Sequence, residues 1–364
     1  MNPILRSPLL IATVVGAALS TAFPAGAYEL SPLPTKAEVF KAKRSYGVAF
    51  RSTFPAIEWG IHTFSNAVHE SLTQQAHECD DTIEACSDID LDFASTGVIA
   101  GVRWNDDPPF RFASGQGRYP ECPADKGGPR TISFALGTTC WVTHFRDVSK
   151  TAERDGQAFL SGKGTLLARS HYGDLQFLHS MAKSSAATSE ATKSAILAWA
   201  EFTWRVQSRL PENISGKVAM GKVPVPGLRE FFPAVEERTV EELFTIGRPW
   251  LRHQLEDIAF GSLLHMVQDS FSAGHTLRRP AGSGSCSVPP VVTFHTYAGQ
   301  DKGDHKKADT KQAATAANSP IVLVLKELVR LRSERAAWTE VRLYLANCVY
   351  ALATPSAVTA EAAK

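Results

Sequence analysis

The chain has 364 residues, 44% of them hydrophobic and 21% charged, which is typical of a globular protein and excludes disordered, collagen-like and coiled-coil classes. Lysine and arginine number 38 against 37 aspartates and glutamates, so no net charge would steer the protein onto a polyanion. We therefore expect no nucleic-acid partner, and no feature of the sequence indicates an obligate protein partner.

Residues 1–27 have the pattern of a cleaved signal peptide. Arg6 precedes the apolar segment Leu9–Phe23, and Ala25-Gly26-Ala27 is typical of a cleavage site. The apolar run of about 15 residues is shorter than the roughly 20 that a membrane span requires. We expect a secreted or periplasmic protein whose mature chain begins at Tyr28, with a single domain over 28–353 and a flexible tail over 354–364.

The single domain is expected to be mainly α. Helical spacing of apolar residues begins around His69 and returns in three longer stretches, which are Ala195–Leu210, Glu241–Val267 and Ile321–Leu352. Residues 96–151 are rich in Gly, Pro, Thr and aromatic side chains, so we predict an insertion of loops and short strands there.

Histidines stand beside carboxylates at helical steps. His265 and Asp269 are four residues apart, so on a helix an imidazole nitrogen and a carboxylate oxygen face the same side and can bind one metal ion. Apolar neighbours such as Leu264 predict burial, and a buried carboxylate must be paired or bind a metal. We expect Gly274 to end this helix and to let His275 turn back toward the same cavity.

Two other segments combine the same residue types. The candidates are His171, Asp174 and His179 in the first segment, and His295, His305 and Asp309 in the second. In the first, so many polar groups among apolar ones would each need a partner, which a metal or substrate site would supply. The second segment is polar and rich in lysine at its end, so taken alone it is typical of a solvated surface.

Six cysteines lie beyond the leader, and an even count in an exported chain indicates disulfides. Six cysteines allow 15 pairings, and local pairing favours Cys79–Cys86, Cys122–Cys140 and Cys286–Cys348. The alternative use, zinc ligation by thiolates, usually needs closely spaced pairs such as CxxC, which are absent.

In their order along the chain, these motifs resemble those of the zinc-dependent phospholipase C family and the related zinc-dependent single-strand nucleases. The most specific match is HMVQDSFSAGH, which carries the family's H-x3-D-x5-H at His265, Asp269 and His275. Weaker matches are the helix at His69, the early aspartate at Asp106, and the last His-x3-carboxylate at His305 and Asp309. The segment HYGDLQFLH further suggests a bacterial branch that hydrolyses phosphatidylcholine.

The resemblance implies a multi-helix fold of that family and two or three zinc ions. The implied ligands are Asp106, His171, His265 and Asp269 for one ion, His275, His305 and Asp309 for a second, and His69 with the bridging Asp269 for a third. His144 fits the His-aromatic-x-Asp step of the family as well as His171 does, and we prefer His171 because its surroundings are apolar. The family completes the third site with an N-terminal tryptophan, whereas this chain is expected to begin at Tyr28. The third ion would then be missing, or it would recruit His62, His77 or His179.

The implied activity is that of a phospholipase C, a phosphoric diester hydrolase that releases diacylglycerol and a phosphorylated head group from phospholipids such as phosphatidylcholine at a membrane surface. Asp106 would orient the attacking water or act as the base. The neutral charge and the apolar, aromatic character of HYGDLQFLH favour a lipid over a nucleic acid. The alternatives are a zinc-dependent single-strand nuclease or 3'-nucleotidase, and an exported helical protein that zinc stabilises without catalysis.

Overall fold

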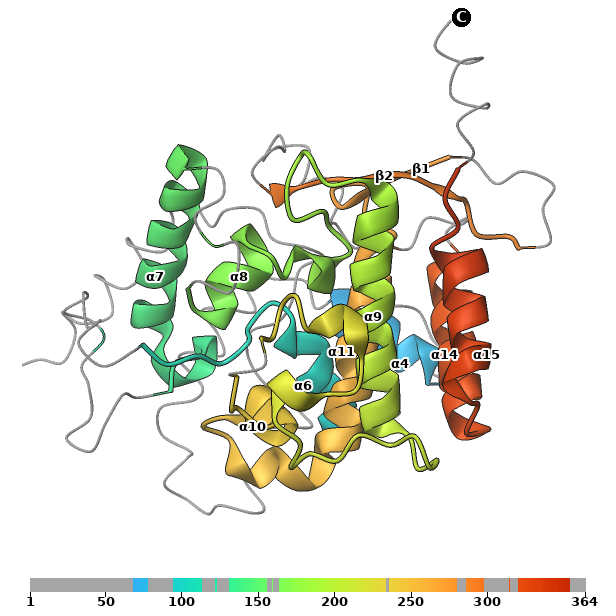
Figure 1. Cartoon of the computed structure of the whole chain (residues 1–364), viewed down its shortest axis with the longest axis horizontal. Helices are drawn as coiled ribbons and strands as arrows, with labels where there is room; N and C mark the ends of the chain where they lie inside the picture. Colours follow the sequence, from blue (N-terminus) through green and yellow to red (C-terminus); the bar gives the residue numbers. More distant parts are fainter. Residues whose placement is uncertain are drawn as a thin grey trace, which may run out of the picture.

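A computed structural model of the chain is mainly helical (Figure 1). It describes residues 68–77, 94–112, 122, 131–155, 159, 164–233, 236–279, 286–297, 314 and 320–353. The expected leader and tail, the Cys79–Cys86 pair, and His62, His305 and Asp309 lie outside the described residues. No helix among the described residues is both long enough and apolar enough to cross a membrane.

Helix α11, Leu255–Asp269, forms the centre of the fold. Every residue from Ile258 to Asp269 is buried, as expected for a helix that is apolar around most of its circumference. Helix α6, Thr96–Trp104, and helix α9, Ser189–Gln207, pack on it, and helix α4, Val68–Ala76, packs against α6 and α11. Figure 1 shows α7 and α8 on one side of this centre, and α14 and α15 on the other.

Two glycines allow α6 and α11 to cross at very short range. A Cβ atom on Gly101 would overlap the carbonyl oxygen of Ile258, and one on Gly261 would lie 2.7 Å from the backbone nitrogen of Val102. The two backbones therefore approach more closely than any residue with a side chain would permit. This crossing brings the end of α6 beside the last two turns of α11.

The region expected to be an insertion of loops and short strands is instead mostly helical where it is described. It contains α6 and most of α7, Phe134–Asp155, which is kinked at Gly137, whereas its described β structure is one isolated bridge between Phe110 and Ile132. The expectation was wrong because it followed composition alone. Buried side chains of α7 recur at helical spacing, among them Cys140, His144, Phe145, Val148 and Ala152.

The longest expected helices are broken into shorter pieces. Residues 241–267 contain most of α10, Val240–Thr245, the 3-10 helix η6, Pro249–Gln254, and most of α11. The break falls at Gly247, whose φ of 75° favours glycine, and at Pro249, which cannot continue the preceding helix. The last stretch divides at Arg335, φ 56°, into α14, Ile321–Ser333, α15, Trp338–Tyr344, and the π-helical turn η8, Leu345–Val349.

The remaining elements are short. They are α8, Leu166–Tyr172, the 3-10 turns η3, Gln176–His179, η4, Met220–Lys222, and η5, Pro226–Leu228, and the strands β1, Thr276–Arg278, and β2, Val291–Phe294. The strands form an antiparallel pair, in which Thr276 lies opposite Phe294.

Disulfides join Cys122 to Cys140 and Cys286 to Cys348, as the local pairing predicted. The second disulfide ties the segment before β2 to η8. Disulfides persist in oxidising compartments, so the two bonds indicate an extracytoplasmic protein.

Candidate metal centre

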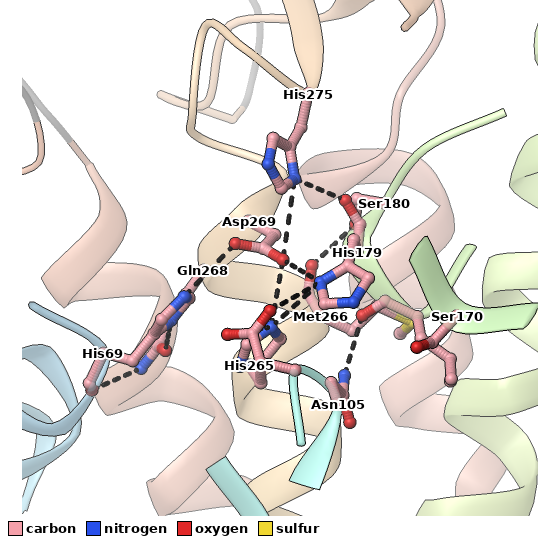
Figure 2. A network of polar contacts seen from close by, with 12 residues as sticks. His69, Asn105, Ser170, His179, Ser180, His265, Met266, Gln268, Asp269 and His275 are labelled. Atoms are coloured by element: carbon pink, nitrogen blue, oxygen red, sulfur yellow. Dashed lines mark hydrogen bonds and ion pairs between the residues drawn. The ribbon is translucent and has the colours of Figure 1, made fainter. Parts of the chain in front are cut away.

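Asp269, the last residue of α11, lies at the centre of a cluster of imidazoles (Figure 2). Its Oδ2 atom is 2.8 Å from His179 Nδ1, 3.0 Å from His265 Nε2 and 3.5 Å from His275 Nδ1, and its Oδ1 atom is 3.4 Å from His69 Nε2. All five side chains are fully buried. Ionisable side chains are almost never fully buried unless they are paired or bind a ligand, so the burial of this cluster indicates a role other than core packing.

A second carboxylate, Asp106, approaches the same imidazoles from the end of α6. Its oxygens lie 3.6 Å from His179 Nδ1, 3.7 Å from His171 Nε2 and 3.8 Å from His265 Nε2. The Asp106 side chain keeps 16% of its surface exposed, whereas the Asp269 side chain keeps none. Asp106 is therefore the carboxylate that solvent can reach.

Within the described residues, two groups of side chains bring ligand atoms close enough together to hold a metal ion. The groups are His69, His265 and Asp269, and Asp106, His179 and His265, and in each the ligand atoms lie within 4.8 Å of one another. His265 belongs to both groups, so the two candidate positions are neighbours.

Local structure explains why these side chains converge. His265 and Asp269 stand one turn apart on α11, and the chain then turns so that the backbone N–H of His275 donates to Ser272 O. His179 ends η3, where Ser180 has a left-handed φ of 51° and its hydroxyl donates to the carbonyl of Met266 on α11. This turn holds the His179 ring against the end of α11.

Asn105, between α6 and Asp106, locks three elements together. Its amide nitrogen donates to Leu178 O at 2.7 Å and to Ser262 O at 3.2 Å, and its oxygen accepts from Ser262 Oγ at 2.6 Å. The side chain is fully buried. Asp106 is thereby fixed relative to the residue before His179 and to the helix that carries His265.

Backbone carbonyls orient several of the imidazoles. His265 Nδ1 lies 2.6 Å from Val102 O, His275 Nδ1 lies 2.7 Å from His179 O, and His171 Nδ1 lies 3.1 Å from Leu167 O. Because a carbonyl oxygen can only accept, each Nδ1 donates, and the Nε2 lone pairs of His265 and His171 are directed toward the carboxylates. Histidine ligands of metals are typically held in this way.

The ionisation of the cluster suits a cation. Burial raises the pKa values of Asp106 and Asp269, but the surrounding imidazoles outweigh it and hold both carboxyl pKa values well below their usual range. Burial lowers the pKa values of His171 and His265, so both rings are neutral and available as ligands. Burial also acts against a proton on His69, but contacts with Asp269 raise its pKa to about 9, so a proton occupies the place where an ion would bind.

The donor set fits zinc. Imidazole nitrogens and carboxylate oxygens are its usual ligands besides thiolates. Among the described residues, His179 Nε2 is buried and has no hydrogen-bond partner, and Asp269 Oδ1 is buried with only the 3.4 Å contact to His69 Nε2. A buried polar atom without a partner costs folding free energy unless a bound ion or other ligand contacts it.

The expected site residues divide into three sets. The structure brings together His69, Asp106, His171, His265, Asp269 and His275, with His179, expected only as an additional ligand, in contact with both carboxylates. His305 and Asp309 lie outside the described residues. The others, which are Asp174, His144 and His295, have different contacts.

Asp174 forms a buried, two-point ion pair with Arg169, with distances of 2.8 and 2.9 Å. The Nε2 atom of His144 lies 2.8 Å from Thr165 Oγ1, and its ring packs on Phe110 and Phe112. The backbone N–H of His295 donates to the carbonyl of His275, so it supports the cluster through the main chain.

The sequence reasoning missed Asn105 and Gln268, which precede Asp106 and Asp269 and hold the cluster in place. It also missed Tyr297, whose ring centroid lies 5.6 Å from that of His171, 6.0 Å from that of His179 and 6.1 Å from that of His275. The sequence does show an amide side chain directly before each aspartate, but the role of that amide depends on which segment of the fold packs against it.

The fold and the site together define a mainly helical, disulfide-bonded protein with a buried histidine–carboxylate cluster. No protein-family model, curated protein or solved structure matches the chain.

Proposed function

We propose that the chain is an exported zinc-dependent phosphodiesterase of the phospholipase C type, which hydrolyses phospholipids such as phosphatidylcholine to diacylglycerol and a phosphorylated head group. One observation carries the proposal: imidazoles from α4, η3, α11 and the turn after α11 meet two carboxylates, the buried Asp269 and the partly exposed Asp106. The substrate class rests on the sequence resemblance and on the neutral charge of the chain.

Two neighbouring zinc ions would be held, one by His69 and Asp269 and the other by Asp106 and His179. His265 faces both positions, but its Nδ1 donates to Val102 O, so its single free nitrogen, Nε2, would bind one of the two ions. His275, with ligands outside the described residues, is the candidate for a third. Bound zinc would supply Lewis acidity, which stabilises charge on phosphoryl oxygens and lowers the pKa of water.

The two carboxylates would have different roles. Asp269 is fully buried and surrounded by imidazoles, so it serves to hold the cluster together. Asp106 is partly exposed and ionised, so it can accept a hydrogen bond from the attacking water. Its strongly lowered pKa makes it a weak base, which favours orientation of the water over storage of its proton.

The test is release of phosphorylated head group from phosphatidylcholine vesicles, with and without a zinc chelator, beside digestion of single-stranded DNA. Cleavage of lipid that the chelator abolishes, with intact DNA, supports the proposal. Cleavage of DNA alone would transfer the protein to the nuclease alternative, and loss of neither substrate would refute both activities.

His265→Ala should abolish zinc binding and hydrolysis, because His265 belongs to both candidate groups. The matched control is His253→Ala, since His253 is exposed on η6. Full activity of the His265 variant would contradict the assignment of the site.

A further inference from the structure

Gln268 lies directly before Asp269 on α11, but its side chain contacts α4. It is fully buried. Its Oε1 atom is 2.6 Å from His69 Nδ1, and its Nε2 atom is 3.2 Å from the carbonyl oxygen of His69 and 2.8 Å from Thr73 Oγ1. One amide therefore contacts both the ring and the main chain of His69.

The oxygen and the nitrogen of a glutamine side chain have nearly the same shape, so the contacts decide which end of the Gln268 amide is which. The carbonyl oxygen of His69 can only accept, so the amide nitrogen must face it. Thr73 Oγ1 already donates to the same carbonyl at 2.8 Å, so it accepts from the amide nitrogen. Gln268 Oε1 is then left to face His69 Nδ1, which must carry a hydrogen.

The tautomer of His69 follows from this orientation. With a hydrogen on Nδ1, the atom available to a metal is Nε2, which faces Asp269 Oδ1 at 3.4 Å. The His69 ring also stacks on that of His265, with centroids 4.1 Å apart and planes inclined by 18°. The amide and the stacking together fix the direction of Nε2.

His69 differs from two of its neighbours in the cluster. The Nδ1 atoms of His265 and His275 are held by backbone carbonyls, which no substitution removes. The Nδ1 atom of His69 is held by a side chain, so the orientation of this one candidate ligand depends on the identity of residue 268.

We propose that Gln268 is a positioning residue that presents His69 as an Nε2 ligand, and so sets the affinity of the metal position at His69 and Asp269 separately from that of the position at Asp106 and His179. This inference rests on the metal centre of the proposed function. The residues around a ligand commonly change metal affinity by about 10- to 100-fold, so the effect is measurable.

The experiment is a zinc titration of the whole protein by calorimetry, with bound zinc counted by elemental analysis. Gln268→Met keeps the length of the side chain and removes all three of its hydrogen bonds, and we expect about 10- to 100-fold weaker binding of one zinc equivalent. Gln268→Glu keeps the acceptor for Nδ1 and should restore that equivalent. The matched control is Gln74→Met, because Gln74 is a buried glutamine on α4 that accepts from Ala94 N, away from the cluster.

His69→Ala identifies which zinc equivalent is affected. It should weaken the same equivalent as Gln268→Met, and the double variant should lose little more than His69→Ala alone, because Gln268 acts through His69. Nitrogen-15 chemical shifts of the His69 ring in the zinc-bound protein provide an independent readout. They should report zinc on Nε2 and hydrogen on Nδ1 in the wild type, and a mixture of the two tautomers in Gln268→Met.

The outcomes separate this inference from the proposed function. A wild-type protein that binds no zinc refutes both. Zinc binding by the wild type, with unchanged affinities and an unchanged His69 tautomer in Gln268→Met, refutes the role of Gln268 alone. If Gln268→Met does not fold, Gln268→Asn replaces it, since this variant keeps the amide but withdraws it from His69 by one methylene group.

Discussion

Gly261→Ala tests whether the close crossing of α6 and α11 supports both the fold and the cluster. Two effects oppose each other. Alanine favours a helix over glycine by about 1 kcal/mol. However, the new methyl group would lie 2.7 Å from the backbone nitrogen of Val102 and 2.8 Å from Gly101 Cα, which are backbone atoms that cannot rotate away.

The steric effect should be the larger one. Overpacking of a dense core costs about 1–3 kcal/mol. Separation of the helices would also stretch the 2.6 Å hydrogen bond between His265 Nδ1 and Val102 O, which contributes about 1 kcal/mol. Against the gain in helix propensity, we expect the free energy of unfolding to fall by about 2 kcal/mol.

The assay is urea unfolding followed by circular dichroism, together with the number of zinc ions bound. Gly216→Ala is the matched control, because the one close approach of its methyl group would be to the Cδ2 atom of Leu255 at 2.6 Å, the end of a flexible side chain, and its contacts with Glu241 would be ordinary ones. This control should change stability by less than about 1 kcal/mol. A Gly261→Ala protein as stable as the wild type, or more stable, would show that helix propensity prevails and that the crossing is not tight.

Two further changes test other parts of the structure. Replacing Cys286 and Cys348 by serine should lower the free energy of unfolding by about 4 kcal/mol, because the disulfide closes a loop of 62 residues and this is the chain-entropy value for a loop of that size. Denaturant unfolding under non-reducing conditions measures the change in stability, and a loss below about 1 kcal/mol would contradict the chain-entropy account. Burial lowers the pKa of His144 to about 4 from 6.5, so its contribution to stability is complete above pH 6.5 and decreases as the pH falls toward 4. When the pH is lowered from 7.5 to 4, the free energy of unfolding should therefore fall by about 3 kcal/mol less in His144→Gln than in the wild type. Urea unfolding at the two pH values measures both decreases, and equal decreases in the two proteins would refute the assigned pKa.

The sequence predicted the helical class and much of the cluster because both depend on local spacing. The step of four residues from His265 to Asp269 placed two groups on one face of a helix, whatever surrounds that helix. Even there, the end of the helix was misplaced: α11 stops at Asp269, and not at Gly274. Glycine favours the end of a helix, but the turn through Ser272 begins earlier.

His179 shows what spacing cannot decide. It lies in the same segment as His171, but His171 was expected as a ligand of the first ion and His179 only as an additional ligand. In the structure, His171 approaches Asp106 at 3.7 Å, whereas His179 reaches Asp269 at 2.8 Å and Asp106 at 3.6 Å. The difference arises from the left-handed turn at Ser180, a non-glycine residue whose conformation is fixed by its contact with α11.

For helix α7 the sequence did carry a local signal, the helical spacing of its apolar residues, but composition was given more weight. The Gly, Pro and Thr content of residues 96–151 indicated loops, and the spacing of Phe145, Val148 and Ala152 was overlooked. Gln268 and Asn105 were beyond prediction from local pattern, because each acts on a segment far away in the sequence.

The hydrogen bonds of Val291 have a consequence for the order in which the protein folds. Its N–H donates to Ala351 O at 2.7 Å, and its carbonyl accepts from Ala353 N at 2.8 Å, so residues 351–353 form the outer edge of the ribbon that follows His275. Contacts between residues so distant in sequence form slowly, because loop-closure entropy must be overcome before they become favourable. The helices themselves can form early from local contacts, whereas the crossing of α6 and α11 and the ribbon beside His275 both join residues that are distant in sequence. A nascent chain would therefore acquire its helices first and its complete histidine–carboxylate cluster last.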